Sequence, residues 1–227
     1  MSETGEPTDL ALVPPLETAQ LDLSRGPVGL AVLLSGTGRT LQNLLHIIAT
    51  GGLDCAVRVV VSSKPAVRGL EIAADAGIPA VIIKRQDFPN DESYSDAVYR
   101  AIRPHGVELI LLAGFLRKLG VPPEMDGRIL NIHPALLPEA ASAAGKGFYG
   151  ERVHAAVLAS GATQSGATVH VVDNGYDTGP VVMHATVPIL PDDNPATLAA
   201  RVFEAERVLY PAAIRRYIAD HPELFGG

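Results

Sequence analysis

In the first half of the chain, short runs of apolar residues alternate with segments of helical periodicity. The runs Val28–Leu34, Val57–Val61 and Leu109–Ala113 are almost entirely apolar, which is typical of strands buried on both faces of a parallel sheet. Between such runs, apolar residues recur every three or four positions, which predicts helices. The other elements predicted in this half are strands at Ala80–Ile83 and Ile129–His133 and helices at Leu41–Ile48, Val67–Ala76 and Asp91–Ile102. The alternation predicts an α/β fold with a doubly wound, mainly parallel sheet.

The second half of the chain shows a different pattern. Ala167–Val172 and Pro180–Ile189 are strand-like segments joined by a short turn, which predicts an antiparallel hairpin appended to the parallel sheet. A helix is expected at Glu151–Ser160. Asn194-Pro195 suits the N-cap and first position of a long C-terminal helix that runs to about Tyr217. The predicted buried stripe of that helix is Leu198, Val202, Leu209 and Ala213.

Composition and charge narrow the class of protein. The chain has 227 residues, 47% hydrophobic and 19% charged, and we expect one folded domain at residues 28–227 after a flexible tail at residues 1–27. The net charge of −7 argues against a general nucleic-acid binder. The single Cys55 excludes an intramolecular disulfide, and no apolar run approaches the ~20 residues of a membrane span. We therefore expect a cytoplasmic protein, with no nucleic-acid or membrane partner, that is a monomer or a homodimer.

Asn131 and His133 lie two residues apart at the end of a predicted buried strand. Their side chains therefore leave the strand on the same face. Pro134 favours an extended His133 and removes a backbone donor, which suits a strand end. An amide beside a titratable imidazole is a candidate reaction site. On these residues alone, a pair that only closes the strand by backbone hydrogen bonds is an equal alternative.

A glycine-rich turn, Ser35–Thr40, follows the first predicted strand and precedes a helix. This order directs backbone N–H groups and the positive helix end toward one point, which favours an anion. Leu41 replaces the third glycine of the dinucleotide-binding fingerprint, and no Walker Gly-Lys-Ser/Thr follows. A tight turn without a ligand is nearly as consistent. Arg39 and Thr40 add a cation and a hydroxyl, which favours a phosphate monoester.

Three more residues are candidates by their place in the predicted fold. Arg117 follows a predicted strand, so it lies at the same sheet edge as the glycine-rich turn. Asp177 lies in the hairpin turn, where Asp commonly acts as a cap. Glu206 lies on the buried stripe of the last helix, so its carboxylate either reaches solvent at the edge of the stripe or contacts a ligand.

Two features are interpreted without a catalytic role. His170 shares a strand face with Thr168 and Val172 and is interpreted as a hydrogen-bonded strand histidine, with a catalytic histidine as the less favoured alternative. The segment Pro138–Gly150 is rich in Ala, Gly and Ser and includes Lys146. It predicts a mobile loop near the site, with an inert surface loop as the alternative.

Four motifs, in this order, resemble those of the phosphoribosylglycinamide formyltransferase family. They are Ser35-Gly36-Thr37-Gly38, Leu112-Ala113-Gly114-Phe115-Leu116-Arg117, Asn131-Ile132-His133-Pro134 with Leu136-Leu137-Pro138, and Asp177-Thr178-Gly179-Pro180. Each motif is modest evidence alone, but four in register are specific. The resemblance extends from Val28 to about Ala219.

The resemblance implies a reaction, a fold and a set of site residues. The reaction is transfer of a formyl group from 10-formyltetrahydrofolate to the amine of glycinamide ribonucleotide in purine biosynthesis, on a Rossmann-like formyltransferase fold and without a metal. The implied catalytic residues are Asn131, His133 and Asp177. The implied substrate contacts are Gly38, Arg39 and Thr40 for the phosphate and Glu206 for the ribose. The implied folate contacts are Leu116, Arg117, Lys118, Leu119, Asp173, Asn174, Gly175, Tyr176 and Asp177.

Three features depart from the family pattern. Asp91 stands where some relatives carry an arginine near the folate, so no folate contact is assigned to it. The segment Glu139–Gly145 is longer and richer in alanine than is usual before Lys146-Gly147. The N-terminal tail has no counterpart in the core of the family.

Other classes remain as alternatives. A methionyl-tRNA formyltransferase would carry a tRNA-binding C-terminal domain, and a formyltetrahydrofolate hydrolase would carry an N-terminal regulatory domain. A non-catalytic nucleotide-binding module would keep the Gly38 turn but would not need Asn131, His133 and Asp177 together. A nicotinamide oxidoreductase is disfavoured because no acid follows Val57–Val61.

The expected chemistry follows from the tetrahedral oxyanion that amine attack on a formyl carbon creates. The site must supply donors for this oxyanion. We expect Asn131 and a protonated or proton-sharing His133 to donate to it, with Asp177 orienting His133 and favouring its imidazolium form. A proton then passes from the amine to N10 of the folate through His133 or a water molecule.

Overall fold

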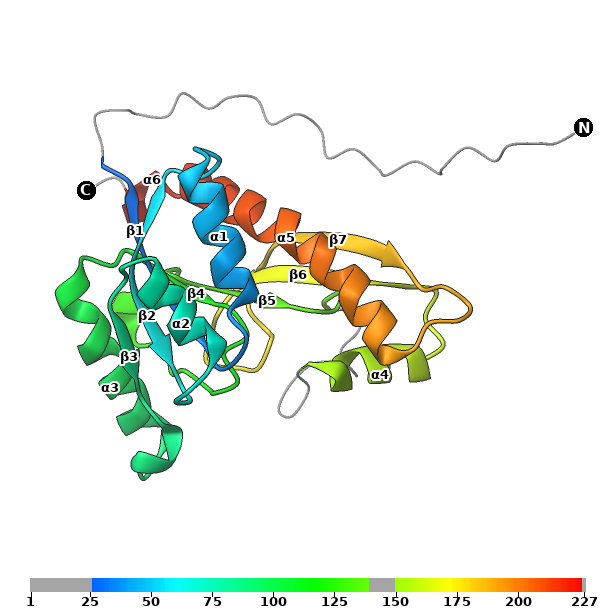
Figure 1. The fold of residues 1–227 in the computed structure, drawn as a ribbon, viewed down its shortest axis with the longest axis horizontal. Coiled ribbons are helices and arrows are strands. Elements are labelled where there is room, and N and C mark those ends of the chain that lie inside the picture. The colour runs from blue at the N-terminus through cyan, green and yellow to red at the C-terminus, as the bar shows by residue number, and fades with distance from the viewer. Residues whose placement is uncertain (1–25, 139–149, 226–227) are drawn as a thin grey trace, which may run out of the picture.

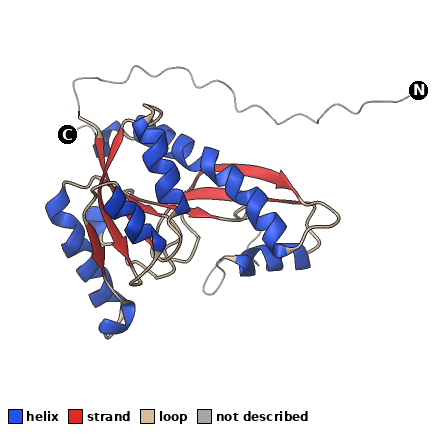
Figure 2. Ribbon diagram, viewed as in Figure 1, coloured by secondary structure: helices blue, strands red, loops and turns tan. Residues whose placement is uncertain are grey.

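The computed structural model describes residues 26–138 and 150–225. Its strands form one mixed sheet in the order β3-β2-β1-β4-β5-β6-β7 (Figures 1 and 2). The strands are β1 (Val28–Leu34), β2 (Cys55–Ser62), β3 (Ala80–Ile82), β4 (Leu109–Leu112), β5 (Ile129–His133), β6 (Gln164–Val171) and β7 (Val181–Pro188). The helices are α1 (Arg39–Ala49), α2 (Arg68–Asp75), α3 (Asp91–Ile102), α4 (Glu151–Ala159), α5 (Pro195–Asp220) and α6 (Pro222–Phe225).

The predicted α/β fold is confirmed. Strands β3, β2, β1, β4 and β5 pair in parallel, whereas β6 pairs antiparallel with both β5 and β7. The predicted hairpin is thus present, although β6 begins at Gln164 rather than at Ala167. The extra residues extend the ladder because Gln164 pairs with Pro188 and Ser165 pairs with Val187.

The sheet separates two layers of apolar side chains. Every residue of β1 is buried, and alternation along the strand sends Leu30 and Val32 to one face and Ala31 and Leu33 to the other. The first face packs against α1, α2, α4 and α5, and the second packs mainly against α3 (Figure 1). This burial on both faces explains why the run Val28–Leu34 is apolar throughout.

Helix α5 spans the sheet and fixes one wall of the site. Asn194 accepts hydrogen bonds from the backbone N–H groups of Ala196 and Thr197, and Thr197 Oγ1 accepts one from the N–H of Asn194. This reciprocal capping box starts the helix as predicted. Farther along, the buried Tyr210 hydroxyl lies 3.2 Å from the Leu112 carbonyl and 3.0 Å from the Leu130 carbonyl, so it can donate to β4 or β5. None of the described helices combines the length and the apolar character that crossing a membrane requires.

Candidate active site

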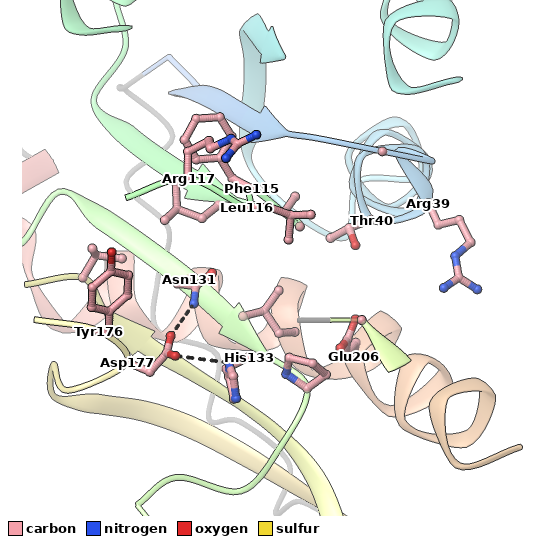
Figure 3. A pocket seen from close by; sticks show the side chains of 18 of the residues that line it. Arg39, Thr40, Phe115, Leu116, Arg117, Asn131, His133, Tyr176, Asp177 and Glu206 are labelled. Atoms are coloured by element: carbon pink, nitrogen blue, oxygen red, sulfur yellow. Dashed lines mark hydrogen bonds and ion pairs between the residues drawn. The ribbon is translucent and has the colours of Figure 1, made fainter. Parts of the chain in front are cut away.

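A cavity of about 1060 Å³ opens where β1, β4 and β5 end (Figure 3). Its wall also includes the β6–β7 connection, the start of α4 and one face of α5. Carboxyl ends of parallel strands lie at one edge of a sheet, so segments distant in the sequence meet there. The predicted site residues that line the cavity are Gly38, Arg39, Thr40, Leu116, Arg117, Lys118, Leu119, Asn131, His133, Asp173, Gly175, Tyr176, Asp177 and Glu206.

Asn131, His133 and Asp177 form a cluster in the central part of the cavity (Figure 3). Asn131 and His133 share a face of β5 because side chains alternate along a strand. Asp177 reaches them from the β6–β7 connection. Its Oδ2 lies 3.7 Å from His133 Nδ1, and its Oδ1 lies 3.5 Å from Asn131 Nδ2. The backbone of Asp177 has φ 55°, a left-handed conformation that is uncommon for residues other than glycine and that is often found at functional sites.

His170 belongs to this cluster, which the sequence interpretation missed. It is 2% exposed, and its Nε2 lies 3.1 Å from Asn131 Nδ2 and 3.7 Å from Asp177 Oδ1. Its Nδ1 lies 3.0 Å from the Val171 carbonyl oxygen, which can only accept, so Nδ1 carries a hydrogen. In the neutral ring Nε2 is then an acceptor for the amide of Asn131. His170 is therefore a hydrogen-bonded strand histidine, as interpreted, but it also contacts the predicted site.

These contacts orient the amide of Asn131. Its nitrogen faces His170 and Asp177, the second at 3.5 Å and thus weakly held. No hydrogen bond within the described residues uses Asn131 Oδ1. The amide therefore offers an acceptor to a ligand directly. To donate to an oxyanion, as the sequence analysis expected, it would have to exchange its weak contact with Asp177.

His154, at the start of α4, is a second histidine that the sequence analysis missed. It lines the cavity and is 4% exposed, and its Nδ1 has no hydrogen-bond partner among the described residues. Burial, with a smaller contribution from the charge of His133, lowers the pKa of His154 to about 4. Its ring is therefore neutral at pH 7. No motif in the sequence marked this residue, because its place depends on how α4 packs on the sheet.

The glycine-rich turn forms one end of the cavity. Gly38 has φ 70° and is the N-cap of α1, so the helix begins at Arg39 and its positive end faces the cavity. A Cβ on Gly38 would lie 2.5 Å from the Cα of Gly69 in α2. The N–H of Gly69 also donates to the carbonyl of Gly36 at 3.2 Å. Helix α2 therefore supports the turn directly.

Arg39 and Glu206 lie at the same end of the cavity (Figure 3). The Arg39 guanidinium stacks over the ring of Phe203 in α5, 3.9 Å from its centroid. Glu206 follows Phe203 by three residues, so both line the cavity from one face of α5. Burial raises the pKa of Glu206 to about 7, although the charge of Arg39 opposes the shift. The carboxyl of Glu206 therefore titrates near neutral pH.

The opposite end is formed by residues 116–119 and 173–177. The Leu116 N–H donates to Ser35 Oγ at 3.0 Å, and the Lys118 ammonium lies 5.0 Å from the centre of the Tyr176 ring. Asn174 does not line the cavity. Its amide accepts from the Val121 N–H at 2.9 Å and donates to the Val121 carbonyl at 3.1 Å, which ties the two segments together.

The structure also places the features that depart from the family pattern. Asp91 lines the cavity, but its Oδ1 lies 2.6 Å from Arg85 Nε, so it pairs with a cation of the protein. The segment 139–149, with Lys146, lies outside the described residues, as does the tail at residues 1–25. Among the described residues, no group of three or more His, Cys, Asp or Glu side chains is placed to hold a metal ion.

The fold and the cavity define an α/β protein with an acid–base cluster open to small molecules. Residues 28–214 match the formyl transferase family. The chain is 43% identical over 203 residues to the trifunctional purine biosynthetic protein adenosine-3 of Drosophila pseudoobscura pseudoobscura, a match that covers 88% of this chain and 14% of that protein. It is 40% identical over 186 residues to the chloroplastic phosphoribosylglycinamide formyltransferase of Vigna unguiculata, which covers 80% of this chain and 58% of the relative.

Solved structures agree with these relatives. The structure of the phosphoribosylglycinamide formyltransferase of Coxiella burnetii matches with a TM-score of 0.74 at 36% identity. The match covers 86% of this chain and 88% of the Coxiella chain. The structure of the formyltetrahydrofolate deformylase of Pseudomonas putida matches with a TM-score of 0.69 at 25% identity. That match covers 83% of this chain and 64% of the Pseudomonas chain. The chain belongs to the formyl transferase family. It spans 14% of the length of the Drosophila relative.

The titration of Glu206 predicts a pH-dependent stability. Its folded-state pKa of about 7 exceeds the ordinary 4.5, so the native state holds this proton more tightly than the unfolded chain does. The resulting stabilisation is complete below about pH 4.5 and is lost as the pH rises through 7. Relative to Glu206→Gln, the wild type should lose up to about 3 kcal/mol of unfolding free energy between these pH values.

Urea denaturation of both proteins at several pH values measures this difference. Glu204→Gln is the matched control, because Glu204 lies on the same helix with its side chain 64% exposed. The control should keep the pH dependence of the wild type. Equal pH dependence of the wild type and Glu206→Gln would contradict the shifted pKa.

Proposed function

We propose that the chain transfers the formyl group of 10-formyltetrahydrofolate to the primary amine of 5'-phosphoribosylglycinamide. The products are 5'-phosphoribosyl-N-formylglycinamide and tetrahydrofolate, a step of purine biosynthesis. The family membership and the phosphoribosylglycinamide formyltransferases among its relatives support this reaction over the other members of the family. In this proposal both small molecules occupy the 1060 Å³ cavity together.

The observation that carries the proposal is the position of the histidine–carboxylate cluster. Asn131, His133 and Asp177 lie between an end that suits a phosphate and a ribose and an end that suits a larger, partly apolar molecule (Figure 3). Two substrates that enter from the two ends would meet at this cluster. Such positioning alone supplies a large part of the rate in a two-substrate reaction.

We assign the phosphate of the ribonucleotide to the start of α1. The N–H groups behind Gly38 and the guanidinium of Arg39 favour an anion there, and the hydroxyl of Thr40 adds a donor. Glu206 would accept hydrogen bonds from the ribose hydroxyls. We assign the folate to the wall formed by residues 116–119 and 173–177, where Leu116 and Tyr176 offer apolar surface.

His133 is the proposed centre of the chemistry. The neutral amine of the ribonucleotide attacks the formyl carbon, a new C–N bond forms, and the C=O electron pair moves to oxygen. The oxyanion then collapses, the bond from carbon to N10 breaks, and one proton passes from the attacking nitrogen to N10. His133, held by Asp177 at 3.7 Å, would donate to the oxyanion and carry this proton, directly or through a water molecule.

Asn131 would act in two successive roles, first as an acceptor for the incoming amine and then as a donor to the oxyanion. Its hydrogen bonds to His170 and Asp177 leave Oδ1 available for the first role. Its Oδ1 would accept from the incoming amine, which orients the nitrogen lone pair toward the formyl carbon. As the oxyanion forms, the N–H held weakly by Asp177 can turn toward it. His170, whose Nε2 accepts from the same amide, would limit how far the amide rotates.

The location and assembly of the protein are part of the proposal. We propose a cytoplasmic enzyme that acts as a monomer or a homodimer. The single Cys55, which is buried, is consistent with a reducing compartment.

A transfer assay tests the proposed function. The purified chain with 10-formyltetrahydrofolate should release tetrahydrofolate only when 5'-phosphoribosylglycinamide is present, with formation of the N-formyl product. Release of tetrahydrofolate and formate without the ribonucleotide would instead indicate a formyltetrahydrofolate deformylase, the activity named for the Pseudomonas putida neighbour. No release under either condition would refute the transferase.

His133→Ala should lower kcat by about 10²- to 10⁴-fold, because both the proton carrier and an oxyanion donor are lost. Binding of the ribonucleotide, measured by calorimetry, should change little, since its phosphate site is at the start of α1. His184→Ala, an exposed histidine of edge strand β7, is the matched control and should keep wild-type turnover. Near-normal turnover of His133→Ala would remove His133 from the mechanism.

Arg39→Gln should raise the KM for the ribonucleotide about 10-fold or more and change kcat much less, because it removes a charge-assisted contact to the phosphate. Arg68→Gln removes the same charge from α2, where the side chain is 67% exposed, and serves as the control. A KM for the ribonucleotide that is equal in Arg39→Gln and the wild type would place the phosphate elsewhere.

A further inference from the structure

Arg39 extends from the start of α1, but the side chain that it contacts belongs to α5. Its guanidinium lies over the ring of Phe203, 3.9 Å from the ring centroid, and both side chains line the cavity. No motif in the sequence marked Phe203, because the contact depends on how α5 packs beside α1. The ring therefore needs an explanation that the four sequence motifs do not supply.

The contact with the ring leaves the hydrogen-bond donors of Arg39 available. At 3.9 Å the central carbon of the guanidinium is close to van der Waals contact with the ring, so the ring covers a flat face of the group. The five N–H donors of a guanidinium lie in its plane and point away from that face. Within the described residues, no hydrogen bond or ion pair uses them. Arg39 is thus held by its face while its edges can bind an anion.

A seam between α1 and α5 places the ring against the guanidinium. One turn after Arg39, Asn43 Nδ2 donates to the Arg207 carbonyl at 2.8 Å, and Arg207 lies one turn after Phe203. The contacting positions therefore advance together along the two helices, which lie side by side and run in the same direction (Figure 1). The contact of Arg39 with Phe203 is the end of this seam at the cavity.

Helix α5 is itself fixed relative to the rest of the fold. Val202, next to Phe203, is fully buried, and the buried Tyr210 hydroxyl lies within hydrogen-bond distance of carbonyls of β4 and β5. Farther along, Arg215 donates to the Gly52 carbonyl, just after α1. The ring is therefore presented by a rigid helix, which suits a residue that positions another side chain.

The same contact keeps two charged groups of the cavity separate. Glu206 lies three residues after Phe203, and the charge of Arg39 opposes the rise of its pKa, so the two groups are near each other. No ion pair joins them within the described residues (Figure 3). A direct pair would occupy both groups that the proposed function assigns to the ribonucleotide. With Arg39 on the ring, its cation remains available for the phosphate and the carboxyl remains available for the ribose.

We propose that Phe203 is a positioning residue for the phosphate of the ribonucleotide. Its ring holds the Arg39 guanidinium by the face, so that the N–H edges are available to a phosphate monoester at the start of α1. This rests on the proposed function, which places the phosphate at that end of the cavity. Because Arg39 is held before the ligand arrives, binding orders this long side chain at a smaller cost in entropy.

Phe203→Leu tests the proposal, because it keeps an apolar side chain but removes the aromatic face. It should raise the KM for the ribonucleotide about 3- to 10-fold and leave kcat within about 2-fold, since the contact acts on binding and not on the reacting atoms. Phe203→Tyr, which keeps the ring, should have a KM close to that of the wild type. Thermal melting shows whether each variant is folded. Equal KM values in Phe203→Leu and the wild type would overturn the proposal.

The effect of the ring should depend on Arg39. In the Arg39→Gln background no cation is left to position, so adding Phe203→Leu should change the KM by less than about 2-fold. An effect of Phe203→Leu that is equally large in both backgrounds would overturn the proposal. The ring would then act on the ligand directly, or on the fold as a whole.

Asn43→Ala is the matched control for the seam. It removes the hydrogen bonds between Asn43 and Arg207, which join the same two helices one turn away, and Asn43 lies outside the cavity. This variant should keep the wild-type KM for the ribonucleotide. A rise in KM as large as that of Phe203→Leu would overturn the proposal, since general loosening of α1 against α5 would then be the cause.

Calorimetric binding of ribose 5-phosphate to the same proteins separates this proposal from the proposed function, because it requires neither the amine nor the folate. If no formyl transfer is found, the proposed function fails. Weaker binding of ribose 5-phosphate to Phe203→Leu, with no further weakening when Phe203→Leu is added to Arg39→Gln, would still support the positioning role. Binding that does not depend on Phe203, or no binding to the wild type, would overturn it.

Discussion

Parallel pairing of β3, β2, β1, β4 and β5 is the constraint on which the cavity depends. Parallel strands send all their carboxyl ends to one edge of the sheet, and each return must cross a face of the sheet as a helix or a long connection. Every turn at that edge can then carry side chains for a ligand. In this chain the segments after β1, β3 and β4 supply cations to the wall of the cavity, and the end of β5 supplies Asn131 and His133.

The change to antiparallel pairing at β6 completes the central cluster. Because Asn131 pairs with His170 across β5 and β6, the histidine lies directly beside the amide. The connection to β7 begins beside the first residue of β5, because the Val172 N–H donates to the Ile129 carbonyl, and it brings Asp177 to 3.7 Å from both His133 and His170. A sheet of purely parallel strands would require another crossover at this point. The short hairpin places a carboxylate within a few residues of β6 instead.

The regular elements were largely predictable, because burial on both faces leaves a direct trace in the sequence. The run Val28–Leu34 and the helix Asp91–Ile102 have the predicted bounds, whereas the start of β6 was missed because Gln164 and Ser165 have no apolar alternation. Residues at strand ends were predictable from the topology of parallel sheets. His170 and His154 were not, since one depends on the β5–β6 register and the other on the packing of α4. Asn174 was expected to contact the folate, but its amide binds the backbone of Val121 instead. The sequence alone does not distinguish an asparagine that binds the backbone from one that binds a ligand.

The close approach of Gly38 and Gly69 limits how this protein can diverge. A side chain at position 38 would collide with the backbone of α2, and a Cβ at position 69 would lie 2.6 Å from the buried side chain of Leu34. Because Gly69 already lacks a side chain, no substitution at position 69 can make room for a side chain at position 38. Substitution is therefore restricted at both glycines, although only Gly38 belongs to the glycine-rich turn after β1. We expect both glycines to be retained among homologues. Gly69 would then look like a functional residue, although its lack of a side chain serves to avoid a clash with Leu34.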